Sequence, residues 1–194
     1  HRDLHSFPTR RSSDLIAQHH PHAPTRVLDW GTGSGCLAIA VAHHAPHARI
    51  TALDLSPASL DLARRNAERH ACADRIRFLL SDGCSALDPA ETFDLLVSNP
   101  PYIPSAEIAT LEPEVRNHDP SLALDGGPDG LAVYRRLARE LAPRLNPAGA
   151  LLLEFGDNQA AALEAILVDA GWILGEVHRD YSGRERFLLT RRKP

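Results

Sequence analysis

Short apolar runs alternate along the chain with longer stretches in which apolar residues recur at helical spacing. Five short runs are rich in aliphatic residues and end at turn-forming or acidic residues, which is typical of buried parallel strands. These runs are Thr25–Asp29, Arg49–Asp54, Arg75–Leu80, Phe93–Val97 and Ala150–Phe155. The stretches between them predict helices at Cys36–Ala45, from Pro57 through His70, at Leu131–Leu145 and at Gln159–Ala170. This alternation predicts an α/β fold with a doubly wound, mainly parallel sheet.

The C-terminal part of the chain departs from this alternation. Two further strands, near Trp172–His178 and at Arg186–Thr190, are separated by a turn at Asp180–Gly183. We therefore expect an antiparallel hairpin at one edge of the sheet. Earlier in the chain, Ile103–Gly130 is irregular and rich in proline, glycine and acidic residues, which is typical of a binding loop or lid. In the helix that ends at His70, the spacing predicts an inward face of Leu60, Leu62, Ala63 and Ala67.

Composition limits the kinds of protein this can be. The 194 residues, 43% hydrophobic and 24% charged, suit one globular domain with a full core. No apolar run approaches the roughly 20 residues of a transmembrane helix, so no membrane contact is expected. Cys36, Cys72 and Cys84 are far apart, which favours a reducing cytoplasm over a disulfide framework. The net charge of −4 argues against a broad phosphate-binding face, so no direct nucleic-acid partner is expected.

A glycine-rich turn follows the first predicted strand. It reads Gly31-Thr32-Gly33-Ser34-Gly35, and its alternating glycines allow the backbone to turn sharply and approach a ligand closely. The spacing differs from the dinucleotide fingerprint Gly-x-Gly-x-x-Gly, and no Gly-Lys-Ser or Gly-Lys-Thr phosphate loop occurs. An adenosyl ligand without a pyrophosphate fits such a loop; a simple strand-to-helix turn is the alternative.

Acidic residues follow the next two predicted strands. Asp54 ends the second strand, where a carboxylate can accept hydrogen bonds from both hydroxyls of a ribose. Asp82, in Ser81-Asp82-Gly83, follows the third strand and can accept from an adenine amino group; a turn-forming role is the alternative. Both positions lie at the carboxyl edge of the predicted sheet.

The fourth predicted strand runs into Ser98-Asn99-Pro100-Pro101-Tyr102. Two consecutive prolines end the strand and have no N–H to donate. They leave a stiff corner with free carbonyls, an amide side chain and an aromatic ring at the sheet edge where ligands bind in open α/β folds. A plain proline-rich turn is the alternative for an isolated Asn-Pro-Pro, but here three other ligand-type features precede the corner.

On these residues the chain resembles the S-adenosylmethionine-dependent class I methyltransferases. Within them it resembles the HemK-type protein-(glutamine N5) methyltransferases, which modify peptide chain release factors. The matching segments are Val27–Asp29, Gly31–Gly35, Asp54, Ser81-Asp82, Asn99–Ile103, Glu112–Val115, Ala123–Gly127, Asp129–Leu131 and Leu153-Glu154-x-Gly156. The resemblance covers residues 16–194 and implies a seven-stranded Rossmann-like sheet, mainly parallel with an antiparallel C-terminal edge hairpin.

The resemblance also implies a cofactor, a partner and a set of site residues. The cofactor is S-adenosylmethionine, held by Asp29, Gly31, Thr32, Gly33, Ser34, Gly35, Asp54, Asp82, Gly83 and Asn99. The partner is a class I release factor, whose glutamine amide would be bound by Asn99, Pro100, Pro101 and Tyr102. Asn99 and Pro100 are the expected catalytic residues. The chain departs from the family at Trp30, where a small or aliphatic residue is usual, and at Gly83, where several relatives place an aromatic residue.

The first fifteen residues differ in character from the rest of the chain. Residues 1–15 read HRDLHSFPTRRSSDL, which resembles the translation of a widely used sequencing adapter residue for residue. We therefore expect a non-native segment at 1–15 and a methyltransferase catalytic domain at 16–194. We also expect this chain to lack the N-terminal helical domain that the resemblance implies and that helps to hold the release factor.

The Asn-Pro-Pro-Tyr corner suits chemistry on a planar nitrogen. The Asn99 side-chain oxygen and the Pro100 carbonyl can accept the two hydrogens of an amide and favour charge developing on its nitrogen, while Tyr102 packs against its flat face. No metal is required. The alternatives are glutamine methylation of a ribosomal protein, N6-methylation of adenine in nucleic acid, and a domain that only binds the cofactor. Glu154, at a strand end near this pocket, is a candidate for an electrostatic or a capping role.

Overall fold

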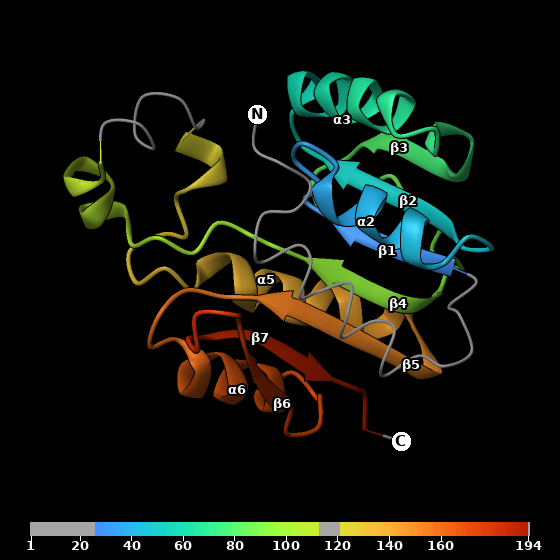
Figure 1. The fold of residues 1–194 in the computed structure, drawn as a ribbon. Helices are drawn as coiled ribbons and strands as arrows, with labels where there is room; N and C mark the ends of the chain where they lie inside the picture. The colour runs from blue at the N-terminus through green and yellow to red at the C-terminus, as the bar shows by residue number, and fades with distance from the viewer. Residues whose placement is uncertain (1–25, 113–120, 194) are drawn as a thin grey trace.

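The computed structural model describes residues 26–112 and 121–193 (Figure 1). Seven strands form one sheet: β1 (Arg26–Trp30), β2 (Arg49–Asp54), β3 (Ile76–Leu80), β4 (Phe93–Ser98), β5 (Leu145–Glu154), β6 (Glu176–Arg179) and β7 (Glu185–Thr190). Their order across the sheet is β3-β2-β1-β4-β5-β7-β6. The first five strands in the chain are parallel, and β7 is antiparallel to both β5 and β6. The mainly parallel sheet and its antiparallel edge hairpin are both confirmed.

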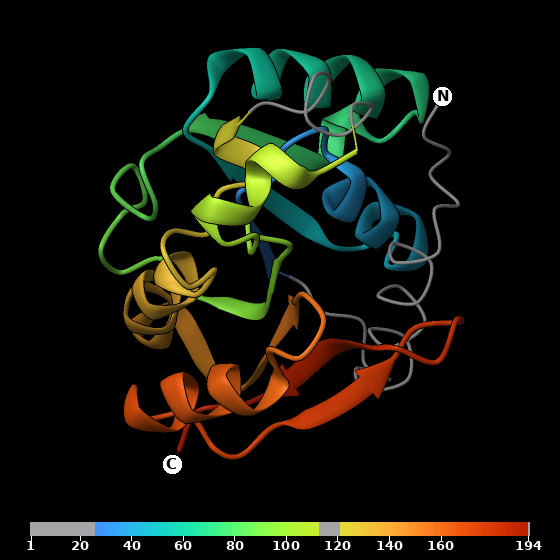
Figure 2. The ribbon, with the colours of Figure 1, turned by 90° about the vertical axis from the view of Figure 1, so that its left-hand side faces the viewer.

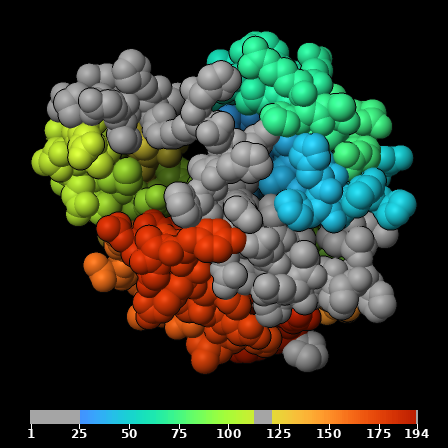
Figure 3. Space-filling view, viewed as in Figure 1, coloured from blue at the N-terminus to red at the C-terminus, as the bar shows by residue number. Residues whose placement is uncertain are grey.

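Helices cover both faces of this sheet. They are α2 (Cys36–His44), α3 (Pro57–Arg69), α5 (Ala132–Leu141) and α6 (Ala160–Asp169), with short 3-10 turns η1 (Ala73–Arg75), η2 (Ser105–Thr110), η3 (Ser121–Ala123) and η4 (Ala142–Arg144). The buried residues of α2, together with Ala67 of α3, belong to one hydrophobic cluster, and those of α5 and α6 belong to a second cluster across the sheet. Figure 3 shows the early part of the chain and the C-terminal part on opposite sides of the molecule.

Strand alternation decides which side chains reach which cluster. In β4, Leu95 and Val97 enter the first cluster, whereas Leu96 enters the second. A strand buried on both faces reads as a continuous apolar run, which is why the sequence pattern locates these strands well. Of the helices in the described ranges, none is both long and apolar enough to cross a membrane.

Several predicted boundaries are wrong. The helix predicted to reach Leu145 ends as an α-helix at Leu141, because Pro143 turns the chain into the 3-10 turn η4. β5 begins at Leu145 rather than Ala150, and its pairing with β4 shifts register between Phe93 and Leu95. The strand expected near Trp172–His178 is shorter: β6 starts at Glu176, and Trp172 makes only an isolated bridge with Arg192.

The predicted inward face of α3 is wrong at one position. Leu60, Ala63 and Ala67 are buried, but Leu62 is 40% exposed. Residues 60, 63 and 67 follow i, i+3, i+7 spacing on one face, and a residue two positions after Leu60 points about 200° away from it. The predictions for residues 1–25, and for Pro113–Val115 in the family match, lie outside the described residues.

Candidate active site

The carboxyl ends of the parallel strands point toward one side of the molecule, which Figure 2 views face on. The glycine loop follows β1, Asp54 ends β2, Asp82 follows β3 and Asn99 follows β4. Since these strands are neighbours in the order β3-β2-β1-β4, the structure brings all four predicted features to one continuous edge.

Asp29 anchors the glycine loop from inside the protein. Its Oδ2 accepts hydrogen bonds from the Thr32 hydroxyl at 2.6 Å and from the Ala38 amide at 3.0 Å. The side chain is fully buried, and burial raises the pKa of Asp29 to about 6, with the bonds from Thr32 and Ala38 working in the opposite direction. The second oxygen, Oδ1, has no hydrogen-bond partner. One buried acceptor therefore stays unused at the base of the loop.

Asp54 holds the same loop from the neighbouring strand. Its Oδ2 accepts from the Gly33 amide at 2.8 Å, and its Oδ1 accepts from the Ser56 amide at 2.8 Å. The Asp54 side chain is partly exposed, and each carboxylate oxygen keeps a further lone pair. The residue can therefore accept hydrogen bonds from a ligand without releasing the loop.

The loop itself leaves room for a ligand. Gly31 and Gly33 have positive φ angles, and a Cβ atom added at either residue would meet nothing within 4 Å. Gly35 is different, because its Cβ would lie 3.1 Å from the Cβ of Ala63 on α3. Gly31 and Gly33 thus allow the backbone to turn and leave open space beside the loop, whereas the absence of a side chain at Gly35 allows the loop to pack against α3.

Asp82 is joined to α5 by an ion pair, and the side chains of α5 lie against Gly83. Asp82 Oδ1 accepts from Arg136 Nη1 at 2.6 Å, and Arg136 Nε donates to Glu140 Oε1 at 2.6 Å. The second oxygen of Glu140 accepts from the Cys84 amide at 3.1 Å. A Cβ at Gly83 would collide with the Glu140 carboxylate. The side chains of Arg136 and Glu140 on α5 therefore occupy the space that a side chain at position 83 would need. The sequence did not indicate this contact.

The corner after β4 has buried residues on both sides of one exposed residue. Ser98 is buried, and its hydroxyl donates to the Trp30 carbonyl at 2.6 Å, which ties the end of β4 to the end of β1. Asn99 is exposed, whereas Pro100 is buried behind it. The Asn99 amide is thus available to a ligand on a backbone that the neighbouring strand supports.

The segment after this corner folds back on it. The Ile103 amide donates to the Leu124 carbonyl at 3.0 Å, and the Gly126 amide donates to the Ile103 carbonyl at 2.8 Å. Asp129 accepts from the Leu131 amide at the start of α5 and pairs with Arg135 at 2.6 Å. The described part of the predicted loop thus contains 3-10 turns and is attached to the corner at its C-terminal end.

A buried acid lies at the end of β5 beside the corner. Glu154 is 6% exposed, and burial raises its pKa to about 7, while the nearby Arg186 opposes that shift. The Glu154 backbone carbonyl accepts from the Tyr134 hydroxyl at 2.8 Å. Burial also raises the pKa of Tyr102, and the Glu154 carboxylate adds to this effect. Glu154 and Tyr102 therefore share one weakly solvated region.

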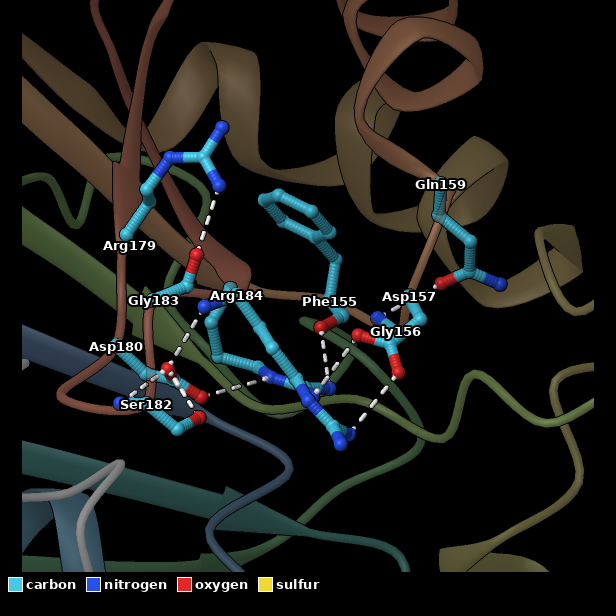
Figure 4. A network of polar contacts seen from close by, with 10 residues as sticks. Phe155, Gly156, Asp157, Gln159, Arg179, Asp180, Ser182, Gly183 and Arg184 are labelled. Atoms are coloured by element: carbon cyan, nitrogen blue, oxygen red, sulfur yellow. Dashed lines mark hydrogen bonds and ion pairs between the residues drawn. The ribbon is translucent and has the colours of Figure 1, made fainter.

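An ion-pair network closes this region on the side of the C-terminal hairpin (Figure 4). Arg184 and Arg186 each lie 3.3 Å from a carboxylate oxygen of Asp157, and Arg186 also donates to the Phe155 carbonyl at 3.0 Å. Asp180 caps the hairpin turn by accepting from the Ser182 and Arg184 amides. Sequence reasoning missed these arginines, because their partners lie far away in the chain.

Within the described ranges, no group of three or more histidine, cysteine, aspartate or glutamate side chains is placed to hold an ion. The three cysteines are free, and Cys72 and Cys84 are buried.

A seven-stranded sheet of this order, with a glycine loop after β1 and an Asn-Pro-Pro-Tyr corner after β4, defines a Rossmann-like methyltransferase. Residues 10–112 match the family model described as "Methyltransferase small domain", and the chain belongs to this family.

Among known proteins, the chain is similar to those named release factor glutamine methyltransferase. It is 48% identical over 168 residues to the one from Rhodospirillum rubrum, covering 87% of this chain and 51% of that protein. It is 49% identical over 167 residues to the one from Deinococcus radiodurans, covering 86% and 58%. The chain thus spans somewhat more than half the length of these relatives.

Solved structures share the fold at low sequence identity. A ribosomal protein L11 methylase from Lactobacillus delbrueckii subsp. bulgaricus superimposes with a TM-score of 0.69 at 22% identity, covering 97% of this chain and 81% of that one. The hMettl16 catalytic domain, solved with an RNA hairpin of the MAT2A 3'UTR, gives 0.73 at 17% identity, covering 97% and 72%. At such identities the likeness concerns the fold alone.

Proposed function

We propose that this chain transfers a methyl group from S-adenosylmethionine to the side-chain amide nitrogen of the glutamine in the Gly-Gly-Gln segment of a class I peptide chain release factor. The observation that carries the proposal is the corner Asn99–Tyr102, exposed at Asn99, at the same sheet edge as the glycine loop and Asp54. The names of the relatives in Rhodospirillum rubrum and Deinococcus radiodurans support the glutamine substrate. Release factors act in translation, so the proposed location is the cytoplasm.

The described residues fit the proposed cofactor. Gly31 and Gly33 border open space, and Asp29 Oδ1 is a buried acceptor without a partner. Asp54 keeps free lone pairs for the ribose hydroxyls, and Asp82 keeps one oxygen for the adenine amino group. When bound, S-adenosylmethionine supplies an electrophilic methyl group on a positively charged sulfur. Thr32, Ser34 and Gly35 shape the turn around it.

The corner residues orient the acceptor nitrogen. An amide nitrogen is a poor nucleophile because its lone pair is delocalised into the carbonyl. Acceptors on Asn99 and Pro100 would hold the two amide hydrogens and stabilise positive charge as it develops on nitrogen. Tyr102 would pack on the flat face of the amide, with Pro101 keeping the corner rigid. The catalytic gain comes mainly from positioning, which in well-oriented systems corresponds to effective molarities on the order of 10⁵ M or more.

A labelled-methyl assay tests the proposal. The chain is incubated with S-adenosylmethionine carrying a labelled methyl group and, in separate reactions, a class I release factor, ribosomal proteins or an adenine-containing oligonucleotide. We expect label on the release factor, and none on a release factor whose Gly-Gly-Gln glutamine is replaced by glutamate. Label on ribosomal protein alone or on the oligonucleotide alone would overturn the substrate. Cofactor binding without transfer to any acceptor would favour a domain that only binds the cofactor.

A further inference from the structure

One side-chain amide joins three segments around the corner. Gln159, just before α6, donates from Nε2 to the Tyr102 carbonyl at 2.9 Å, and the same nitrogen lies 3.5 Å from the Gly130 carbonyl. Its Oε1 accepts from the Gly156 amide at 2.9 Å, a contact drawn in Figure 4. The amide therefore connects the end of the corner, the loop before α5 and the turn after β5.

Glycines allow this close arrangement. A Cβ at Gly130 would collide with the Tyr102 carbonyl oxygen and lie 2.8 Å from Gln159 Nε2. A Cβ at Gly156 would lie 2.8 Å from the Tyr102 ring, and one at Gly126 would lie 2.8 Å from the Tyr102 Cα. Real Cβ contacts are longer than these distances, so the backbone at these three glycines packs directly on Tyr102, whose carbonyl accepts from Gln159.

We infer that Gln159 is a positioning residue for the methyl-acceptor site. By holding the Tyr102 carbonyl, it fixes the end of a corner whose two prolines have no N–H to contribute. The acceptor atoms of Asn99 and Pro100 lie three and two residues before this anchor, respectively, so their orientation depends on it. A role for Gln159 in methyl transfer rests on the proposed function, whereas its effect on the structure of the corner does not. Sequence reasoning had given Gln159 no role beyond the start of a helix.

The variant Gln159→Glu tests this inference with almost no change in shape. At neutral pH its carboxylate cannot donate to the Tyr102 carbonyl and repels it. We expect kcat for methylation of the release factor to fall about tenfold or more, because small misplacements of reacting groups cost large factors in rate. KM for the release factor and the Kd of S-adenosylhomocysteine should change less than about threefold, because the groups that bind these molecules remain.

Acid restores the missing donor in this variant. A protonated carboxyl group has one O–H that can donate to the Tyr102 carbonyl. The ratio of variant to wild-type kcat should therefore rise as the pH falls toward the usual pKa range of glutamate. A merely structural role would give no such recovery. The matched control is Asp169→Asn at the exposed far end of α6, which changes the charge by one unit and should leave kcat unchanged.

Hydrogen exchange separates this inference from the proposed function. The Ile103 and Gly126 amides are both bonded across the segment that follows Tyr102, and Gln159→Glu should speed their exchange. If the wild-type chain methylates no release factor, the proposed function fails, and the exchange result alone decides whether Gln159 holds the corner. Unchanged exchange, or unchanged kcat in an active enzyme, would overturn the inference. So would a kcat ratio that does not vary with pH.

Discussion

The Gly33 amide donates a hydrogen bond to Asp54 Oδ2 at 2.8 Å, so the acid at the end of β2 holds the loop that follows β1. Asp54→Ala would remove this bond, the bond from Ser56 and the proposed acceptor for the ribose. We expect the affinity for S-adenosylhomocysteine, measured by titration calorimetry, to fall about tenfold or more, since losing hydrogen bonds to a charged group costs roughly 1.5–3 kcal/mol. The control Asp61→Ala, on the exposed surface of α3, should bind normally. Normal binding by Asp54→Ala would remove Asp54 from the cofactor site.

The exposed amide of Asn99 is predicted to act on the acceptor rather than on protein stability. Asn99→Ala should lower kcat for methyl transfer by about a hundredfold or more, as expected for removal of a group that stabilises developing charge. Its affinity for S-adenosylhomocysteine should stay within about threefold of wild type, because the loop and Asp54 remain. Radiolabel transfer and calorimetry on the same preparations check both values. Retained turnover would show that the corner has only a structural role.

Arg136 and Arg135 provide a matched pair on α5. Arg136 contacts Asp82, whereas Arg135 pairs with Asp129, and the two arginine side chains are 42% and 44% exposed. We expect Arg136→Ala to weaken S-adenosylhomocysteine binding about threefold to tenfold, because Asp82, the proposed acceptor for the adenine amino group, would lose the partner that orients it. Arg135→Ala should leave that affinity unchanged. Equal effects of the two substitutions would mean that the Asp82 contact plays no part in binding.

The buried Glu154 predicts a specific pH dependence of stability. Burial raises its pKa from 4.5 to about 7, so between these values the folded protein holds a proton that the unfolded chain has lost. Stability should therefore fall as the pH rises through this window, by at most about 3 kcal/mol from this group.

Glu154→Gln removes that titration and so provides the test. Urea unfolding of both proteins at pH 5 and pH 8 should show the variant gaining stability relative to wild type at the higher pH. The pKa of Asp29 is also raised, so Asp29 lowers the stability of both proteins as the pH rises. This contribution is the same in both and cancels in the comparison. A difference in stability that is the same at both pH values would contradict the prediction.

Leu60 and Leu62 lie two residues apart on α3 but differ in burial. Leu60 is 2% exposed, so Leu60→Ala should reduce the free energy of unfolding by about 2–5 kcal/mol. Leu62→Ala removes the same atoms from a site that is 40% exposed and should cost less than about 1 kcal/mol. Chemical denaturation of the two variants checks this ordering, and similar losses for both would mean that Leu62 is buried in solution.

Much of the fold was predictable because buried strands carry their own signal. The run Arg49–Asp54 matches β2 at both ends, and the runs at Phe93 and Arg186 locate β4 and β7 to within one residue. Neighbouring residues also sufficed to place four features at strand ends: the glycine loop, Asp54, Asp82 and Asn99. Once the strands are parallel and adjacent, topology brings those ends to one edge.

Contacts between distant segments were not predictable in this way. Nothing in the sequence near Gly83 indicates that Arg136 and Glu140 occupy its side-chain space, and nothing near Tyr102 indicates Gln159. Helix length was also misjudged where Pro143 converts the end of a helix into a 3-10 turn.

Local sequence patterns suffice to predict the α/β class, the strands and the types of residue at the sheet edge, because the apolar period and the turn residues act over a few neighbouring positions. Long-range packing brings together the residues that contact one another there: Asp54 with Gly33, Asp82 with Arg136, and Gln159 with Tyr102. These pairs lie 21 to 57 residues apart in the chain. Only the packing of helices on the sheet fixes the distance between such residues, and local patterns carry no information about it.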